Sequence, residues 1–150
     1  ERIPGIAITT DIIVGFPGET DVDFGDTLSL VKRLRFDSAF TFVYSPRSGT
    51  QAAEMPDQVD EALRTERIME LVALQNKITE ERNRVYEGKT TQVLVEGIST
   101  RNPGHVCGRT STSKMVNFEG GADLIGHFVD VKITRGKKTT LFGTLVEEGM

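Results

Sequence analysis

The residues of this chain best suited to binding a small ligand form a glycine-rich turn, Gly15-Phe16-Pro17-Gly18-Glu19-Thr20. The turn follows an apolar run that ends at Val14 and precedes a helical pattern that begins at Asp21. Glycine lets backbone approach a ligand without interference from a Cβ atom, and α/β proteins bind cofactors at turns that end strands. The same residues also fit a plain strand-to-helix turn, and composition alone favours that simpler interpretation. The turn lacks the Gly-Lys-Ser/Thr ending of a Walker A loop.

Aspartates near this turn could suggest a metal site. Asp21, Asp23 and Asp26 lie in the opening turns of the predicted helix, however, where they complement the positive end of its dipole. The sequence holds one cysteine, Cys107, which can form no internal disulfide and cannot ligate zinc or a cluster unaided. We therefore predict no catalytic residue and no metal ligand within these 150 residues.

The elements around the turn predict a strand–helix–strand unit. Residues 6–14 are rich in Ile and Val and predict a strand buried on both faces, as in a parallel sheet. Thr20 is a good helix N-cap, and Asp23 can complete a capping box with it. Residues 36–44 predict a second buried strand. Because two strands do not make a full sheet, we expect the rest of it to lie in an amino-terminal segment outside this chain.

A long helix and a set of short strands follow. Residues 57–88 carry an apolar stripe at helical spacing and end at Gly88. Five short alternating segments, separated by Gly, Pro and Asn, then predict a five-stranded OB-like β-barrel. The segments span residues 93–97, 106–110, 115–118, 128–133 and 140–146. We therefore predict an incomplete α/β domain over residues 1–55, a connecting helix over 56–88 and a small all-β barrel over 89–150.

Composition is that of an ordinary globular protein, with 37% apolar and 27% charged residues. No run is long and apolar enough to span a membrane, and the single cysteine suits a reducing compartment, so we expect a cytoplasmic protein without a membrane partner. Residues 1–88 carry 10 Lys/Arg and 16 Asp/Glu, a net charge of −6, whereas residues 89–150 carry 8 and 6, a net charge of +2. The barrel half therefore permits a phosphate-bearing partner.

Basic and aromatic residues are interspersed along the barrel half. Small barrels with this composition commonly bind single-stranded or looped RNA. A solubilising distribution of charge explains the pattern about equally well, and we expect the three phenylalanines of this half to be core residues. The basic residues that dominate its loops and strand faces are Arg101, Arg109, Lys114, Lys132, Arg135, Lys137 and Lys138, and the phenylalanines are Phe118, Phe128 and Phe142.

Residues 9–20 (TTDIIVGFPGET) and 36–50 (FDSAFTFVYSPRSGT) resemble the last strands of the radical S-adenosylmethionine methylthiotransferases. Residues 95–97, 108–110, 116–118 and 123–126 resemble the TRAM domain of that family, a small RNA-binding barrel. Residues 40–47 are most similar to the branch that modifies isopentenylated adenosine beside the tRNA anticodon. The alternatives are the branch that methylthiolates an aspartate of a ribosomal protein, and a non-catalytic RNA-binding module.

The resemblance implies cofactors that this chain cannot hold alone. Enzymes of the family use S-adenosylmethionine and two 4Fe–4S clusters, one of them held by a Cys-x3-Cys-x2-Cys triad. Neither cysteine group occurs in this sequence. We therefore expect the clusters and the catalytic centre to lie in amino-terminal domains of a longer parent protein, and we expect this chain alone to be inactive.

The resemblance also implies roles for individual residues. In radical S-adenosylmethionine enzymes the strand before the Gly-Pro-Gly turn helps to enclose the adenine, so Ile13, Val14 and Gly15 are the expected cofactor-proximal residues. Arg47, after the next strand, is an expected phosphate or carboxylate partner on the substrate side. In the TRAM-like barrel, we expect salt-dependent contacts with the tRNA backbone from Arg109, Lys114, Lys132, Lys137 and Lys138.

Overall fold

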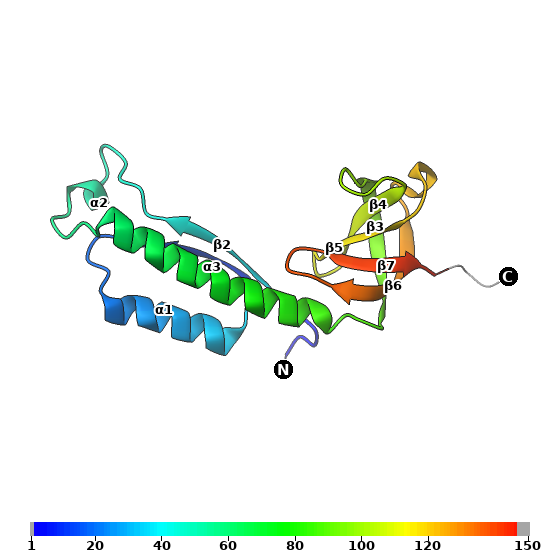
Figure 1. The fold of residues 1–150 in the computed structure, drawn as a ribbon, viewed down its shortest axis with the longest axis horizontal. Coiled ribbons are helices and arrows are strands. Elements are labelled where there is room, and N and C mark those ends of the chain that lie inside the picture. Colours follow the sequence, from blue (N-terminus) through cyan, green and yellow to red (C-terminus); the bar gives the residue numbers. More distant parts are fainter. Residues whose placement is uncertain (1, 147–150) are drawn as a thin grey trace. The chain divides into compact units, whose positions relative to one another are not determined.

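The computed structural model describes residues 2–146, which form two compact units (Figure 1). One unit holds residues 7–79, and the other holds residues 80–146 with the few residues that precede Ala7. The first unit is α/β and the second is built around a β-barrel. The predicted fold class, an incomplete α/β part followed by a small barrel, is confirmed. No helix among the described residues is long and apolar enough to cross a membrane.

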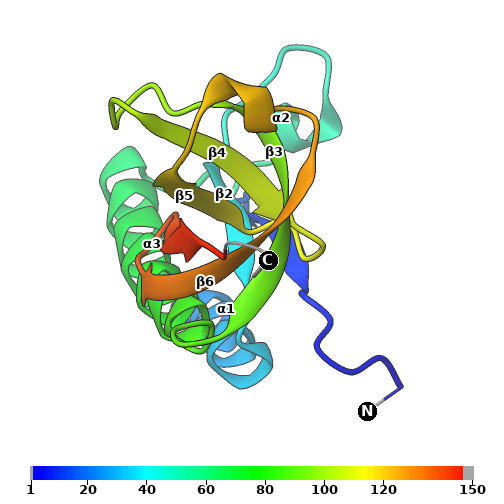
Figure 2. The same ribbon diagram turned by 90° about the vertical axis from the view of Figure 1, so that its right-hand side faces the viewer.

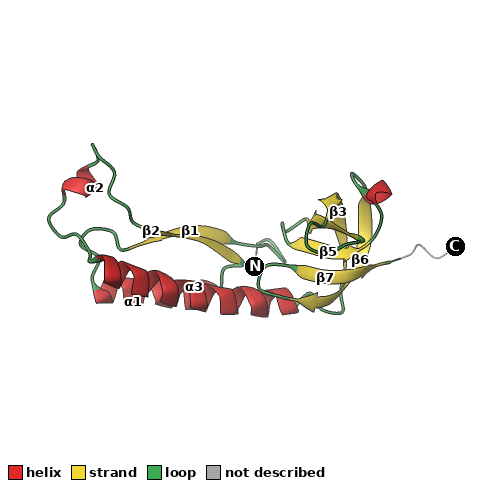
Figure 3. Cartoon of the chain, turned by 45° about the horizontal axis from the view of Figure 1, so that its top comes forward, coloured by secondary structure: helices red, strands yellow, loops and turns green. Residues whose placement is uncertain are grey.

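The α/β unit contains a parallel two-stranded sheet, with β1 and β2 in register from Thr9 opposite Ser38 to Val14 opposite Val43. Figure 3 shows helices α1 and α3 together on one side of this sheet. A short helix, α2, occupies the segment predicted as a connector, because Thr50 caps it by accepting a hydrogen bond from the Ala53 N–H. The elements are β1 (Thr9–Val14), α1 (Asp21–Leu34), β2 (Ser38–Val43), α2 (Gln51–Glu54) and α3 (Glu61–Arg84).

Only one face of the β1–β2 sheet is buried. Val14 packs there with residues of both long helices, including Phe24, Val31 and Leu71. The opposite face is open, and its Ile13, Phe40 and Phe42 are 56%, 64% and 52% exposed. The prediction of strands buried on both faces is therefore wrong for this chain, since no described element covers the second face.

The second unit is a closed five-stranded barrel with the strand order β3-β4-β5-β7-β6 (Figure 2). Closure depends on a short parallel pairing of β5 with β7, while the other neighbouring strands pair antiparallel. All five predicted strands are present, several of them longer than predicted. The elements are β3 (Thr90–Ile98), β4 (His105–Thr110), β5 (Met115–Glu119), the 3₁₀ helix η1 (Ala122–Leu124), β6 (Phe128–Gly136) and β7 (Leu141–Leu145).

The barrel interior is filled by alternate residues of every strand, mostly valines around the buried ring of Phe118. Successive residues of a strand point to opposite faces. Val129 and Leu141 pack against this core, so their neighbours Phe128 and Phe142 belong to the outer face. Phe128 is accordingly 66% exposed. The expectation of three core phenylalanines is therefore correct for Phe118 and wrong for Phe128 and Phe142.

A buried arginine of α3 holds the turn that follows β1. Arg67 is only 3% exposed, and its Nη1 donates to the Glu19 Oε1 (2.8 Å) and to the Glu19 carbonyl oxygen (3.1 Å). Its Nη2 donates to the Asp21 Oδ1 at 2.7 Å. The same Glu19 Oε1 accepts the Gly15 N–H at 3.0 Å. One guanidinium therefore connects α3, the glycine turn and the first residue of α1.

The charge of Arg67 is maintained by these acceptors. Burial alone would lower the pKa of the guanidinium, but hydrogen bonds to Asp21 and Glu19 raise it above its usual value. The Glu19 side chain is itself nearly buried, whereas that of Asp21 is largely exposed. Because exposed ion pairs contribute little and a buried charge without a partner costs much, the pairing with Glu19 matters more for stability than that with Asp21.

We expect Arg67→Met to lower the free energy of unfolding of the α/β unit by about 3–5 kcal/mol, because it leaves the Glu19 carboxylate buried without its partner. Asp21→Asn is the matched control and should cost about 1 kcal/mol or less, since Asp21 is exposed. Denaturant unfolding followed by helical circular dichroism measures both. Equal losses in the two variants would contradict this account of the turn.

The helix α1 begins with the predicted capping box. The Thr20 Oγ1 accepts the Asp23 N–H (3.2 Å), and the Asp23 Oδ2 accepts the Thr20 N–H (2.8 Å). The Thr20 N–H, and then its hydroxyl, hold the pKa of the Asp23 carboxyl below its ordinary value of 3.8. A lowered pKa stabilises the folded state above the unfolded-state value, and this contribution is lost as the pH falls through the folded-state value.

Asp23→Asn should therefore lower the melting temperature at neutral pH, and the gap from the parent chain should narrow once the pH falls well below 3.8. Asp26→Asn, in the same helix but outside the capping box, is the control. Thermal unfolding at a series of pH values tests this. A gap that stays constant across the acid range would show that the Asp23 carboxylate adds no pH-dependent stability.

Candidate functional site

The glycine turn is shaped by a side chain of α3. Gly15 has a positive φ of 74°, and a Cβ atom there would collide with the Cγ of Arg64. The Arg64 Nη1 donates to the Tyr44 carbonyl oxygen at 2.8 Å, directly after β2. The Tyr44 ring meets that of Phe16 edge-on, with 5.3 Å between centroids. The space that glycine leaves at this turn is thus occupied by Arg64.

The three expected cofactor-proximal residues have different environments. Val14 is fully buried on the helix-covered side of the sheet, whereas Ile13 lies on the open side. Ile13 is opposite Phe42 in the sheet register, and Phe40 lies two residues before Phe42 on the same face. The open face therefore presents a continuous apolar strip, and of the three residues only Ile13 contributes a side chain to it.

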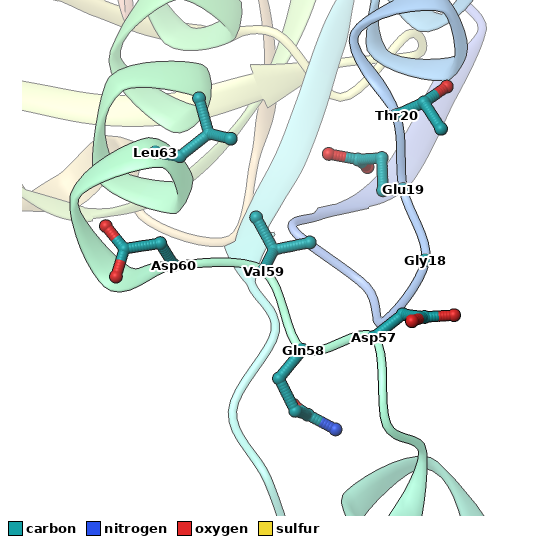
Figure 4. A pocket seen from close by; sticks show the side chains of 8 residues that line it. All are labelled: Gly18, Glu19, Thr20, Asp57, Gln58, Val59, Asp60 and Leu63. Carbon is teal, nitrogen blue, oxygen red and sulfur yellow. The ribbon is translucent and has the colours of Figure 1, made fainter.

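A shallow pocket of about 430 Å³ lies beside the turn, where Gly18 donates to the Asp57 carbonyl oxygen at 2.7 Å (Figure 4). Its charged lining residues, Glu19, Asp57 and Asp60, are all acidic. Such a lining does not suit a phosphate. Within the described part of the chain, no group of three or more His, Cys, Asp or Glu residues is placed to hold a metal ion. We assign this pocket no ligand.

Arg47 is exposed in the loop between β2 and α2. Its carbonyl oxygen accepts the Thr50 hydroxyl at 2.7 Å, which fixes the loop backbone. Its side chain forms no ion pair with another described residue. Arg47 is thus available to an anionic group.

The predicted RNA-binding residues of the barrel fall into two groups by exposure. Arg109 on β4 is half-exposed, and its Nε lies 3.4 Å from the Glu96 Oε2. Lys132 faces outward from β6. Lys114, in the turn between β4 and β5, is only 9% exposed, and its backbone N–H donates to the Thr110 hydroxyl. Little of Lys114 is therefore available to a phosphate.

Several cations surround the turn between β6 and β7. Lys137 and Lys138 lie in this turn, and the Lys137 Nζ sits 5.2 Å from the centre of the Phe142 ring. With the end of α3 the turn encloses a concave pocket of about 480 Å³, which we call the α3–β7 notch. Its lining residues are Glu80, Arg84, Glu87, Arg135, Gly136, Lys137, Lys138 and Thr139.

The sequence-based prediction of helix α3 rested on its apolar stripe and assigned no role to its arginines. A signal was present. Arg67 lies four residues after Leu63 and four before Leu71, so it occupies a position of the apolar stripe. A charge at such a position indicates a buried ion pair. Arg84 carries no comparable signal, because basic residues are common in the last turn of any helix.

Comparisons with known proteins include one match confined to the second unit and others that cover both units. The TRAM domain family model matches residues 84–146. Several curated relatives that match over nearly the whole chain are tRNA-2-methylthio-N(6)-dimethylallyladenosine synthases. The protein of Thermoanaerobacter sp. (strain X514) is 57% identical over 97% of this chain and 31% of its own length. That of Natranaerobius thermophilus is 52% identical over 99% of the chain and 33% of its own length.

A third such synthase, from Carboxydothermus hydrogenoformans, is 54% identical over 97% of the chain. The chain spans about a third of the length of the curated relatives it matches. The resemblance found in the sequence is thus confirmed. Over about a third of their length, these tRNA-2-methylthio-N(6)-dimethylallyladenosine synthases are similar to this chain, and the barrel lies within the residues that match the TRAM domain model.

Proposed function

We propose that this chain is the carboxy-terminal part of a radical S-adenosylmethionine methylthiotransferase that adds a methylthio group to C2 of N6-isopentenyladenosine beside the tRNA anticodon. The observation that carries the proposal is the 57% identity, over 97% of the chain, to a synthase of that name. The matched region covers the open-faced α/β unit as well as the barrel. The parent protein, rather than this piece, is the proposed catalyst.

The residues of this chain do not fit an iron–sulfur cluster. A 4Fe–4S cluster needs several cysteine thiolates, and the sequence has only Cys107, which lies on a barrel strand. We therefore place both proposed clusters in parent domains outside this chain. In this proposal, S-adenosylmethionine is bound jointly by those domains and by this chain. The apolar strip of Ile13, Phe40 and Phe42 offers surface against which an adenine could pack.

The barrel is the proposed tRNA-binding part. Its interior is filled by Phe118 and the surrounding valines, so a nucleic acid can bind only outside. Lys132, Lys137 and Lys138 are all exposed there. Lysines on a surface contact phosphates rather than base edges, so binding should be salt-dependent and should discriminate little between sequences. The parent's remaining domains would then select the nucleoside.

We expect the 150-residue chain to bind tRNA, and the triple change of Lys132, Lys137 and Lys138 to Gln to weaken binding by about tenfold or more. The slope of log affinity against log salt should fall by about one for each phosphate that is no longer neutralised. Lys32→Gln with Arg33→Gln, on α1, is the control for charge removal away from the barrel. A triple variant with an unchanged slope would contradict the assignment.

The full-length parent should methylthiolate tRNA that carries isopentenyladenosine, and the triple lysine variant should raise KM for tRNA with little change in kcat, because those residues bind the substrate away from the reacting atoms. Steady-state assays on modified tRNA measure both constants. Activity confined to a ribosomal protein would favour the other branch of the family. A parent sequence without the two cysteine groups would leave only an RNA-binding module.

A further inference from the structure

The α3–β7 notch has a rigid backbone frame. A Cβ atom on Gly136 would collide with the carbonyl group of Asn83, so the end of β6 lies directly against the last turn of α3. The buried Asn83 side chain donates from Nδ2 to the Lys137 carbonyl oxygen at 2.6 Å. The Glu87 Oε1 accepts the Gly136 N–H at 2.9 Å. The turn that bears Lys137 and Lys138 is therefore fixed on the helix end.

Positive charge dominates the lining of the notch. Its cations are Arg84, Arg135, Lys137 and Lys138, against two carboxylates. Both carboxylates are already engaged: that of Glu80 pairs with Arg84 at 2.8 Å, and that of Glu87 accepts the Gly136 N–H.

Arg135 and Lys138 form no ion pair with another described residue, and the Lys137 ammonium lies over the face of the Phe142 ring. Three exposed cations, at the end of β6 and in the turn after it, therefore line one concavity without an ion-pair partner among the described residues.

We propose that the notch binds a backbone phosphate of the RNA, with Arg135 and Lys138 as its direct partners and Lys137 beside them. The inference rests on the proposed RNA-binding function and makes it specific to one place. A volume of about 480 Å³ is large enough for a phosphate together with its sugar. Arginine provides a planar fork that matches phosphate oxygens, and lysine adds a mobile point charge.

The inference separates residues that sequence reasoning treated alike. Lys132 lies opposite Thr90 and Thr144 in the strand register and does not line the notch. Any phosphate that Lys132 contacts is therefore separate from the one bound in the notch. Arg84 and Arg135, by contrast, enter the site from α3 and from the end of β6.

The test compares two double variants of the 150-residue chain that remove equal charge. Arg135→Gln with Lys138→Gln empties the notch of its direct partners, and Lys89→Gln with Arg101→Gln removes two exposed cations of the same unit that do not line the notch. All four side chains are exposed, so both variants should fold. Fluorescence anisotropy with labelled tRNA, repeated over a range of salt concentrations, measures affinity and slope.

We expect the notch variant to bind about tenfold more weakly with a salt slope smaller by about one, and the control variant to change clearly less in both. The notch substitutions should weaken binding of a single-stranded DNA with the sequence of the anticodon arm in the same proportion, because both polymers contain phosphodiesters. The amide resonance of Gly136 should shift on RNA addition in the unmutated 150-residue chain and not in the notch variant.

The outcomes distinguish this inference from the function beneath it. If the unmutated 150-residue chain binds tRNA and the two double variants weaken that binding equally, the notch is not a phosphate site although the barrel still binds RNA. A loss confined to RNA, with DNA binding unaffected, would also overturn the inference, since it would show recognition of the ribose. If the unmutated 150-residue chain binds no tRNA at all, the proposed function itself fails.

Discussion

The α/β unit depends on a guanidinium that has been taken out of water. Arg67 is buried above the Phe24 ring of α1, and three acceptors from Glu19 and Asp21 offset the cost of its burial. Because the guanidinium is a rigid fork, it fixes the directions of those acceptors and with them the path of the chain between β1 and α1. The glycine turn is thus held from the helix side, and its shape does not require a bound ligand.

Local pattern was sufficient to predict most of the fold. Two strands, both long helices and five barrel strands follow from periodicity and turn residues, and the capping box at Thr20 follows from the spacing of two side chains. Exposure was harder, because an apolar strand residue has the same sequence signature whether or not another element covers it. Ile13, Phe40 and Phe42 are exposed for that reason. Phe128 and Phe142 could have been placed outside by strict alternation with Val129 and Leu141.

Sites formed by residues that are distant in the sequence could not be predicted from the sequence alone. The notch brings Arg84 next to Arg135 only because β6 ends against the last turn of α3, and that contact depends on the absence of a side chain at Gly136. Composition shows that the barrel half is basic, but it cannot show which cations converge. Lys114 illustrates the reverse case, since its position in a basic segment suggested a surface contact and its backbone turn keeps it nearly buried.

The two sheets differ in what they leave unpaired. The barrel closes through β5 and β7, so each of its strands has a hydrogen-bonded neighbour on both sides. Another chain therefore cannot extend the barrel by strand addition, and a partner has to bind it through side chains. The β1–β2 ribbon has two outer strands, each with one neighbour, so its peptide groups can still template a further strand. Fusing a solubility partner close to β1 would therefore guard against aggregation more effectively than the same fusion at the barrel.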